Sequence, residues 1–116
     1  MSFYNAYIDM DDALKRIGGN EDFYKKLLER FSSGNHLEEL ENAIAVNDMY
    51  EASRVAHKIK GVAANLSLTR LNVLSKELEL IIENGLDHTS KLDEFRDAYG
   101  MTMQVISLTT DKVTSN

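Results

Sequence analysis

The stretch Ala56–Leu66 reads AHKIKGVAANL, and the spacing of its apolar residues predicts an amphipathic helix. At about 100° per residue, the small and apolar side chains in and just before this stretch fall on one stripe. The members of that stripe are Ala52, Val55, Ala56, Ile59, Val62, Ala63 and Leu66. His57 projects about 160° away from Ile59, the centre of the stripe, so its imidazole is expected to point to water.

A glycine, Gly61, follows His57 by about one helical turn on the same outward face. Glycine inside a helix costs roughly 1 kcal/mol relative to alanine, so its presence calls for a local reason. Ala64 is a second small residue on that face. Small side chains there leave room for another molecule to approach the imidazole. The pattern therefore predicts a reactive histidine.

Length and composition limit the class of protein. The 116 residues are expected to form one domain, 1–116. The chain has no cysteine, which excludes a disulfide scaffold and thiolate metal sites, and no proline, which together with the long periodic runs favours a helical protein. Its apolar runs are too short to span a membrane, and no basic segment followed by an apolar core opens the chain, so a cytoplasmic location is expected.

The net charge of −6 argues against nucleic acid as a partner, because a phosphate backbone requires a basic footprint. The local charge around His57 has the opposite sign. Arg54, Lys58 and Lys60 follow one another between residues 53 and 60 without an acid among them. Such a cluster alone would be interpreted as a solvated helix face. Its position around an outward histidine gives it a possible chemical role.

Capping residues and glycines divide the chain into helices. The expected N-caps are Asp9 or Asp11, Asn20, Asn35 with Glu38, Asp48 with Glu51, and Ser67. The expected ends are Gly18-Gly19, Gly34, Asn47-Asp48 and Asn84-Gly85. The last helix follows Asp87–Ser90, contains Gly100, and places Leu92, Phe95, Tyr99, Met103, Ile106 and Val113 in one row. The predicted fold is all-α: an up-and-down antiparallel four-helix bundle with one or two short additional N-terminal helices.

Other candidate sites in the chain are weaker. His36 and His88 lack a second ligand at helical spacing, so both are expected to be ordinary surface residues, and no metal site is predicted. The glycines are scattered and no Gly-Lys-Ser/Thr sequence occurs, so no ATP site or other cofactor is expected. Tyr50 lies on the outward face with His57, where it either contacts a partner or is a half-exposed tyrosine with its hydroxyl in water.

The chemistry available to His57 is nucleophilic. A neutral imidazole nitrogen attacks phosphoryl groups, and histidine is substantially neutral at cytoplasmic pH. Lys60 lies about one turn away and can neutralise charge on phosphoryl oxygens. Arg54 and Lys58 would further lower the cost of the roughly −1.5 to −2 charges on a phosphorylated side chain.

The motif Ala56-His57-x-Ile59-Lys60-Gly61-x-Ala63-x-x-Leu66 resembles the signature of the histidine-containing phosphotransfer (HPt) domain of multistep phosphorelays. The segment from Ile8 to Phe31 is similar to the lead-in of many such domains, so the resemblance covers most of the chain. Two departures stand out. Many members have a glycine where this chain has Ser67. In the facing helix, where some members place a glutamine or arginine, this chain offers Glu79 and Glu83, to which no role is assigned.

The resemblance implies that His57 accepts a phosphoryl group from a receiver-domain phospho-aspartate and passes it to the aspartate of another receiver. Lys60 would assist electrostatically and Gly61 would keep the approach open. The implied partners are response-regulator receiver domains and a hybrid sensor kinase, and magnesium would be held by the receiver. A monomer is expected as well, because one exposed histidine per bundle requires no symmetry. The docking surface is expected to include Tyr50, Arg54, Lys58, Ala64 and Leu68.

Two other functions are compatible with the sequence. A helical adaptor, such as a degenerate HPt-like domain, would hold a partner in an exposed groove without phosphotransfer. A sensor kinase dimerisation domain fits less well, because such motifs usually follow the histidine with an acid and then Arg-x-Pro. Here Lys58 follows His57, and the chain has no proline. Whether the chain is free-standing or a module of a hybrid kinase stays open.

Overall fold

The structure is a computed structural model that describes residues 6–111, and all regular elements in this range are helices. They are α1 Met10–Arg16, α2 Glu21–Ser32, α3 His36–Ala45, α4 Met49–Asn65, α5 Thr69–Glu83 and α6 Thr89–Asp111. The predicted all-α class is confirmed. Within the same range, no helix combines the length and the apolar character that crossing a membrane requires.

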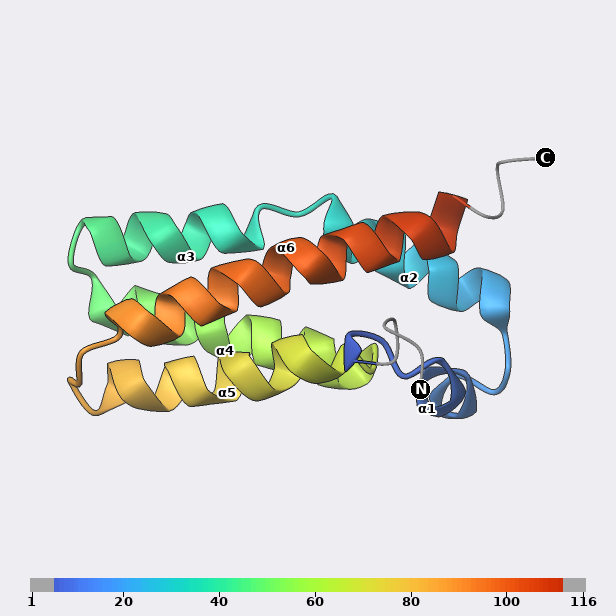
Figure 1. The fold of residues 1–116 in the computed structure, drawn as a ribbon, viewed down its shortest axis with the longest axis horizontal. Coiled ribbons are helices and arrows are strands. Elements are labelled where there is room, and N and C mark those ends of the chain that lie inside the picture. Colours follow the sequence, from blue (N-terminus) through green and yellow to red (C-terminus); the bar gives the residue numbers. More distant parts are fainter. Residues whose placement is uncertain (1–5, 112–116) are drawn as a thin grey trace.

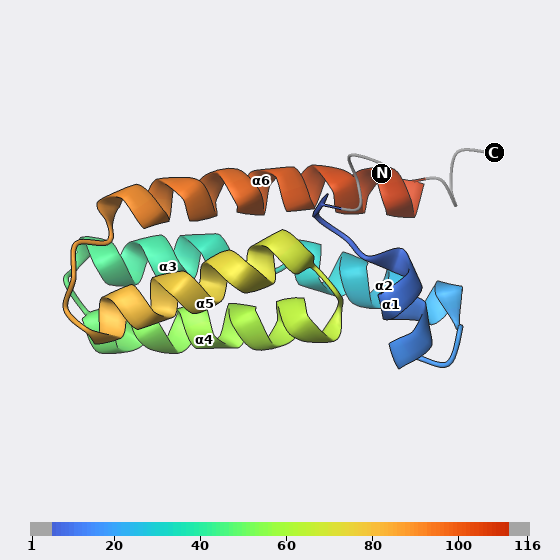
Figure 2. The same cartoon turned by 60° about the horizontal axis from the view of Figure 1, so that its bottom comes forward.

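The longer helices pack side by side along the long axis of the molecule (Figure 1). α4 packs against α3 and α5, α5 packs against α6, and α6 packs against α2. Figure 1 shows that the chain reverses direction between α3 and α4, between α4 and α5, and between α5 and α6. α2 and α3 follow each other along the same axis, and α6 runs past both of them (Figures 1 and 2). The short α1 packs against α2.

Three of the predicted caps form as expected. The side chains of Asp9, Asn20 and Asp48 each accept a hydrogen bond of 3.0–3.1 Å from the backbone N–H three residues later. Each bond satisfies a donor that the first turn of a helix leaves free. Asn35 does precede α3, but its side chain makes no capping bond, so the predicted capping box with Glu38 is wrong.

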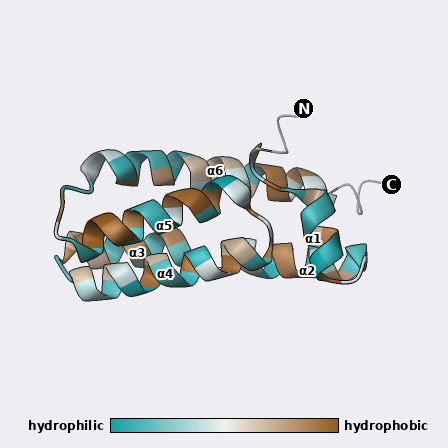
Figure 3. Ribbon diagram, turned by 90° about the horizontal axis from the view of Figure 1, so that it is seen from below, coloured by the Kyte–Doolittle hydropathy of each residue, from teal (hydrophilic) through white to brown (hydrophobic). Residues whose placement is uncertain are grey.

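The core is built from the apolar stripes of the helices, and Figure 3 shows hydrophobic and hydrophilic residues alternating around them. All members of the stripe predicted around Ile59 are buried except Val62, which is partly buried and packs against the core, and Leu66 lies just after the end of α4. α6 continues through Gly100 without interruption, and Leu92, Phe95, Tyr99 and Ile106 are buried as predicted. Val113 lies outside the described residues.

Neighbouring turns of α6 contact different helices. Near the middle of α6, the ring of Tyr99 lies 6.0 Å from that of Phe31 at the end of α2. One turn earlier, Arg96 forms an ion pair with Glu41 of α3. α6 therefore bridges the break between α2 and α3.

The turn between α4 and α5 differs from the prediction. Ser67 adopts a left-handed conformation, with φ of 57°, and its hydroxyl donates a hydrogen bond of 2.7 Å to Asp12 instead of capping α5. Its carbonyl accepts a bond of 3.0 Å from the backbone N–H of Asp9. Leu68 is the residue that precedes α5, and it is fully buried. The predictions that Ser67 caps α5 and that Leu68 contacts partners are therefore wrong, because the chain turns into the core directly after α4.

Position 67 gives a first stability prediction. Replacing Ser67 by alanine removes the bond to Asp12 and keeps the left-handed strain, whereas glycine removes both the bond and the strain. We expect the Ser67→Ala variant to be less stable than Ser67→Gly by about 1 kcal/mol. Urea unfolding followed by circular dichroism measures the difference. Equal stabilities of the two variants would contradict a strained backbone at this turn.

Candidate functional site

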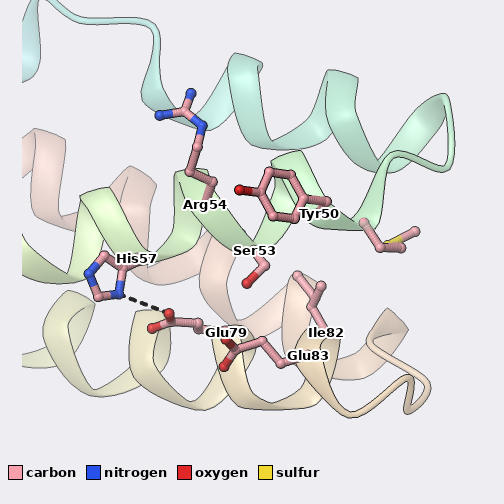
Figure 4. A pocket seen from close by; sticks show the side chains of 8 residues that line it. Tyr50, Ser53, Arg54, His57, Glu79, Ile82 and Glu83 are labelled. Carbon is pink, nitrogen blue, oxygen red and sulfur yellow. Dashed lines mark hydrogen bonds and ion pairs between the residues drawn. The ribbon is translucent and has the colours of Figure 1, made fainter.

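His57 lies in the middle of α4, on the face opposite the buried stripe. Its neighbours Ala56 and Ile59 are fully buried, so the helix that carries it is anchored in the core. The imidazole itself is 67% exposed. It lines an open hollow of about 540 Å³ between α4 and α5. The lining residues, drawn in Figure 4, are Met49, Tyr50, Ser53, Arg54, His57, Glu79, Ile82 and Glu83.

The carboxylate of Glu79, on α5, joins His57 to Lys60. Its Oε2 lies 2.9 Å from Nδ1 of His57 (Figure 4), and its Oε1 lies 2.9 Å from Nζ of Lys60. An ionised carboxylate only accepts hydrogen bonds, so Nδ1 of the neutral imidazole carries the proton. The other ring nitrogen, Nε2, then holds the free lone pair.

Glu79 remains ionised in spite of its burial. It is 8% exposed, and this burial would raise its pKa. The hydrogen bonds and charges of Lys60 and His57 act in the opposite direction and outweigh the burial, so the pKa of Glu79 lies below its ordinary value. The carboxylate is therefore charged at neutral pH and holds the imidazole in one tautomer.

Several of the predicted site residues lie near His57. Lys60 contacts the same carboxylate, that of Glu79, whereas Tyr50 and Arg54 line the hollow, with Tyr50 84% exposed. Gly61 is exposed, and a Cβ added there would meet nothing within 4 Å. The protein itself therefore has space for a side chain at Gly61. Ala64 is half-buried about one further turn along α4.

Two of the predicted basic groups have other partners. Arg54 forms a two-point ion pair with Glu51, one turn earlier on α4, and this bond lowers the pKa of the Glu51 carboxyl. Lys58 lies 3.3 Å from Glu39 of α3 and does not line the hollow. The cluster of positive charge expected around His57 is thus reduced by acids from the same helix and from α3.

Glu79 is the site residue that the sequence reasoning missed. The buried side of α5 consists of Leu71, Leu74, Ser75, Leu78, Glu79 and Ile82. Glu79 is the one charged residue on the buried side of a helix within the described range. A carboxylate on an apolar stripe requires a compensating partner. A glutamate within the apolar row of α5 is therefore the feature of the sequence that could have indicated a site residue. It does not by itself identify His57 and Lys60 as the partners.

The other histidines lie apart from the hollow. His36 stacks on Phe31 with ring centroids 5.0 Å apart, and its Nδ1 is buried without a hydrogen-bond partner. Burial, and secondarily the charge of Lys58, lower the pKa of His36. The prediction of an ordinary surface residue is therefore wrong for His36, whereas His88 is partly exposed. No group of three metal-ligating side chains occurs among the described residues.

The chain is thus a small all-helical module that presents a carboxylate-bound histidine to solvent. The Hpt domain model matches residues 27–104, and the chain belongs to the Hpt domain family. Domains of this family are phosphotransfer modules without a kinase site of their own, and they interact with receiver domains of response regulators in phosphorelays. Searches of the curated proteins and of the solved structures gave no significant match.

The Glu79 carboxylate gives a prediction about pH. Because its pKa is lower in the folded than in the unfolded chain, its contribution to stability is complete above the ordinary value of 4.5 and is lost as pH falls through the lowered value. We expect Glu79→Gln to reduce the free energy of unfolding by about 1 kcal/mol at pH 7. The difference in free energy of unfolding between the variant and the original chain should decrease as the pH falls from about 5 to about 3.

Urea unfolding at pH 7, 5 and 3 measures this difference. Glu77→Gln is the matched control, since Glu77 lies on the same helix with an exposed side chain that pairs with Lys91. Its effect should be smaller, because exposed ion pairs contribute little. A difference for Glu79→Gln that stays constant over the three pH values would contradict the pKa argument.

Proposed function

We propose that His57 is the phosphoacceptor of a phosphorelay and that the phosphoryl group is carried on Nε2. The observation that supports this is the bond between Nδ1 and the ionised Glu79, which leaves the Nε2 lone pair on the solvent side. The imidazole is exposed, so a partner can reach it without any rearrangement of the bundle. Membership of the Hpt domain family supports the same role.

The proposed reaction starts from an aspartyl phosphate on a receiver domain. The Nε2 lone pair of His57 attacks phosphorus, an N–P bond forms, and the bond from phosphorus to the aspartate oxygen breaks as the carboxylate leaves. The proton on Nδ1 stays in its bond to Glu79, whose negative charge stabilises the positive charge that develops on the ring. Transfer to a second receiver follows the same path in reverse, with magnesium held by the receiver.

Lys60 has two parts in this proposal. Its ammonium group lies 2.9 Å from Oε1 of Glu79, so it keeps that carboxylate ionised and fixed. It is also 29% exposed on the side chain and lies within about one turn of His57, where it can neutralise charge on phosphoryl oxygens. The second effect lowers the cost of adding a dianionic group beside the negatively charged Glu79.

We further propose that the chain forms one HPt domain over 1–116, with α3 to α6 as an up-and-down four-helix bundle. It would act in the cytoplasm as a monomer, because one exposed histidine per bundle requires no symmetry. Its partners would be response-regulator receiver domains, and a hybrid sensor kinase would supply the first phosphoryl group. It would bind no cofactor and would not itself be an enzyme.

The second candidate function is a helical adaptor without phosphotransfer. The open hollow beside His57 supports it, since a groove of about 540 Å³ can hold part of a partner whether or not a group is transferred. The two functions differ in one respect. Replacing His57 by glutamine would abolish a relay and leave an adaptor intact.

Phosphoramidate tests the acceptor directly. We expect the chain to take up one acid-labile phosphate at neutral pH, detected by intact-mass spectrometry, and nitrogen-15 NMR to place it on Nε2. His57→Gln should take up none, because it removes the nucleophile. His88→Gln, which changes a histidine outside the hollow, should be labelled as the original chain is. Labelling of the His57→Gln variant would overturn the assignment.

Gly61 tests the open approach. Its position in a helix is costly and its surroundings are empty, so Gly61→Gln should raise the free energy of unfolding by about 0.5–1 kcal/mol. It should also slow phosphoryl transfer from receivers by about tenfold or more, because a side chain there stands between the partner and the imidazole. The measurements are urea unfolding and the rate of transfer from a phosphorylated receiver.

Gly100 provides a matched control for Gly61. It also lies inside a helix, is exposed, and has nothing within 4 Å of an added Cβ. Gly100→Gln should therefore stabilise the chain to a similar extent without slowing transfer. If Gly61→Gln transfers as fast as Gly100→Gln, the glycine has no role in access.

A further inference from the structure

The hollow beside His57 extends in one direction only along the bundle. From the imidazole it runs toward the start of α4 and the end of α5 (Figure 4). On α4 it is walled by Tyr50, Ser53 and Arg54. Its lining includes neither Gly61 nor Ala64, which lie on the other side of His57. A partner that covers His57 and fills this hollow would therefore extend toward Tyr50.

The charged groups of this hollow are compensated with one exception. Arg54 pairs with Glu51, and Glu79 pairs with Lys60 and His57. Glu83 is the last residue of α5 and is exposed, and its carboxylate has no ion pair or hydrogen bond to any described residue. The hollow thus has one uncompensated charge, and it is negative.

Apolar surface lies beside this carboxylate. Met49 lines the same end of the hollow and is partly exposed, and Tyr50 next to it is 84% exposed. Leu86, just after the end of α5, is 61% exposed. Large apolar side chains exposed together are typical of an interaction surface. This end of the hollow combines an apolar area with a single acid.

We infer that the groove from His57 to Glu83 docks the receiver domain, through a part of the receiver surface that presents an apolar side chain to Tyr50 and Met49 and a lysine or arginine to Glu83. The inference rests on the proposed function and adds to it the chemistry of the partner. Glu83 determines which receivers are accepted, since receivers with an acid at the facing position are repelled.

A receiver domain fits this groove better than an anionic surface does. The chain has a net charge of −6, and the one uncompensated group in the groove is an acid, so a nucleic acid or an acidic membrane would be repelled. The groove is also continuous with the imidazole that must meet the aspartyl phosphate. Contacts at Glu83 and Tyr50 would fix the orientation in which the two domains meet.

The test compares transfer with chemical labelling. Isolated receiver domains are phosphorylated with acetyl phosphate and Mg²⁺, and the rate of transfer to the chain is measured at low and at high salt. The rate of labelling by phosphoramidate, which needs no docking, is measured for every variant. The variants are Glu83→Lys, Glu83→Gln and the control Glu29→Lys, an exposed acid on α2 outside the groove.

For receivers that the original chain accepts, the ratio of transfer rate to labelling rate should fall by about tenfold in Glu83→Lys at low salt. It should fall less in Glu83→Gln, and the loss in Glu83→Lys should shrink as added salt screens the charges. Glu29→Lys should keep the original ratio. Replacing the facing basic residue of the receiver by glutamate should restore transfer to Glu83→Lys. The fold should persist, because a lysine at a helix C-terminus is favourable.

Three results would overturn the inference. The first is an unchanged ratio in Glu83→Lys for every accepted receiver. The second is an equal loss in Glu29→Lys, which would show an effect of net charge alone. The third is the absence of both labelling and transfer in the original chain, which would overturn the proposed function as well. If the original chain is labelled and accepts transfer, an unchanged ratio in Glu83→Lys would contradict the docking groove and leave the proposed phosphotransfer function intact.

Discussion

The contact of the Glu79 carboxylate with His57 and Lys60 is the interaction on which the site depends. It links α4 to α5 at the level of the imidazole and uses both carboxylate oxygens. Because each oxygen already has a partner, the carboxylate is compensated although it is almost fully buried. The contact that joins α4 to α5 therefore also fixes the tautomer of the ring.

The rest of the bundle keeps this contact in register. Below His57, the buried stripe of α4 locks the helix against the core and prevents it from rotating. At the far end, Ser67 joins the α4–α5 turn to the N-terminal segment through Asp9 and Asp12. The hydroxyl of Tyr24 donates a hydrogen bond to the carbonyl of Leu66 in the same turn. These bonds fix where α5 begins and therefore where Glu79 lies.

Most of the helices and the outward position of His57 could be predicted from the sequence, because both follow from local periodicity and capping. The stripe of α4 and the caps at Asp9, Asn20 and Asp48 are contained within single helices. Glu79 could not be placed, since its partners depend on the register of two helices that meet only in the fold. Ser67 and Leu68 were misjudged for the same reason: a segment far away in sequence decides the conformation of that turn.

The bridging position of α6 has a consequence for the connection between α2 and α3. Since α6 contacts Phe31 on one side of this connection and Glu41 on the other, it packs across residues 33–35 and joins the two helices. The stacked rings of Phe31 and His36 also span this link, with centroids 5.0 Å apart. A side chain added at Gly34 would lie 2.6 Å from the His36 ring, so the connection tolerates little change in length or bulk, and the alignment of α2 with α3 depends on α6 and on this link together.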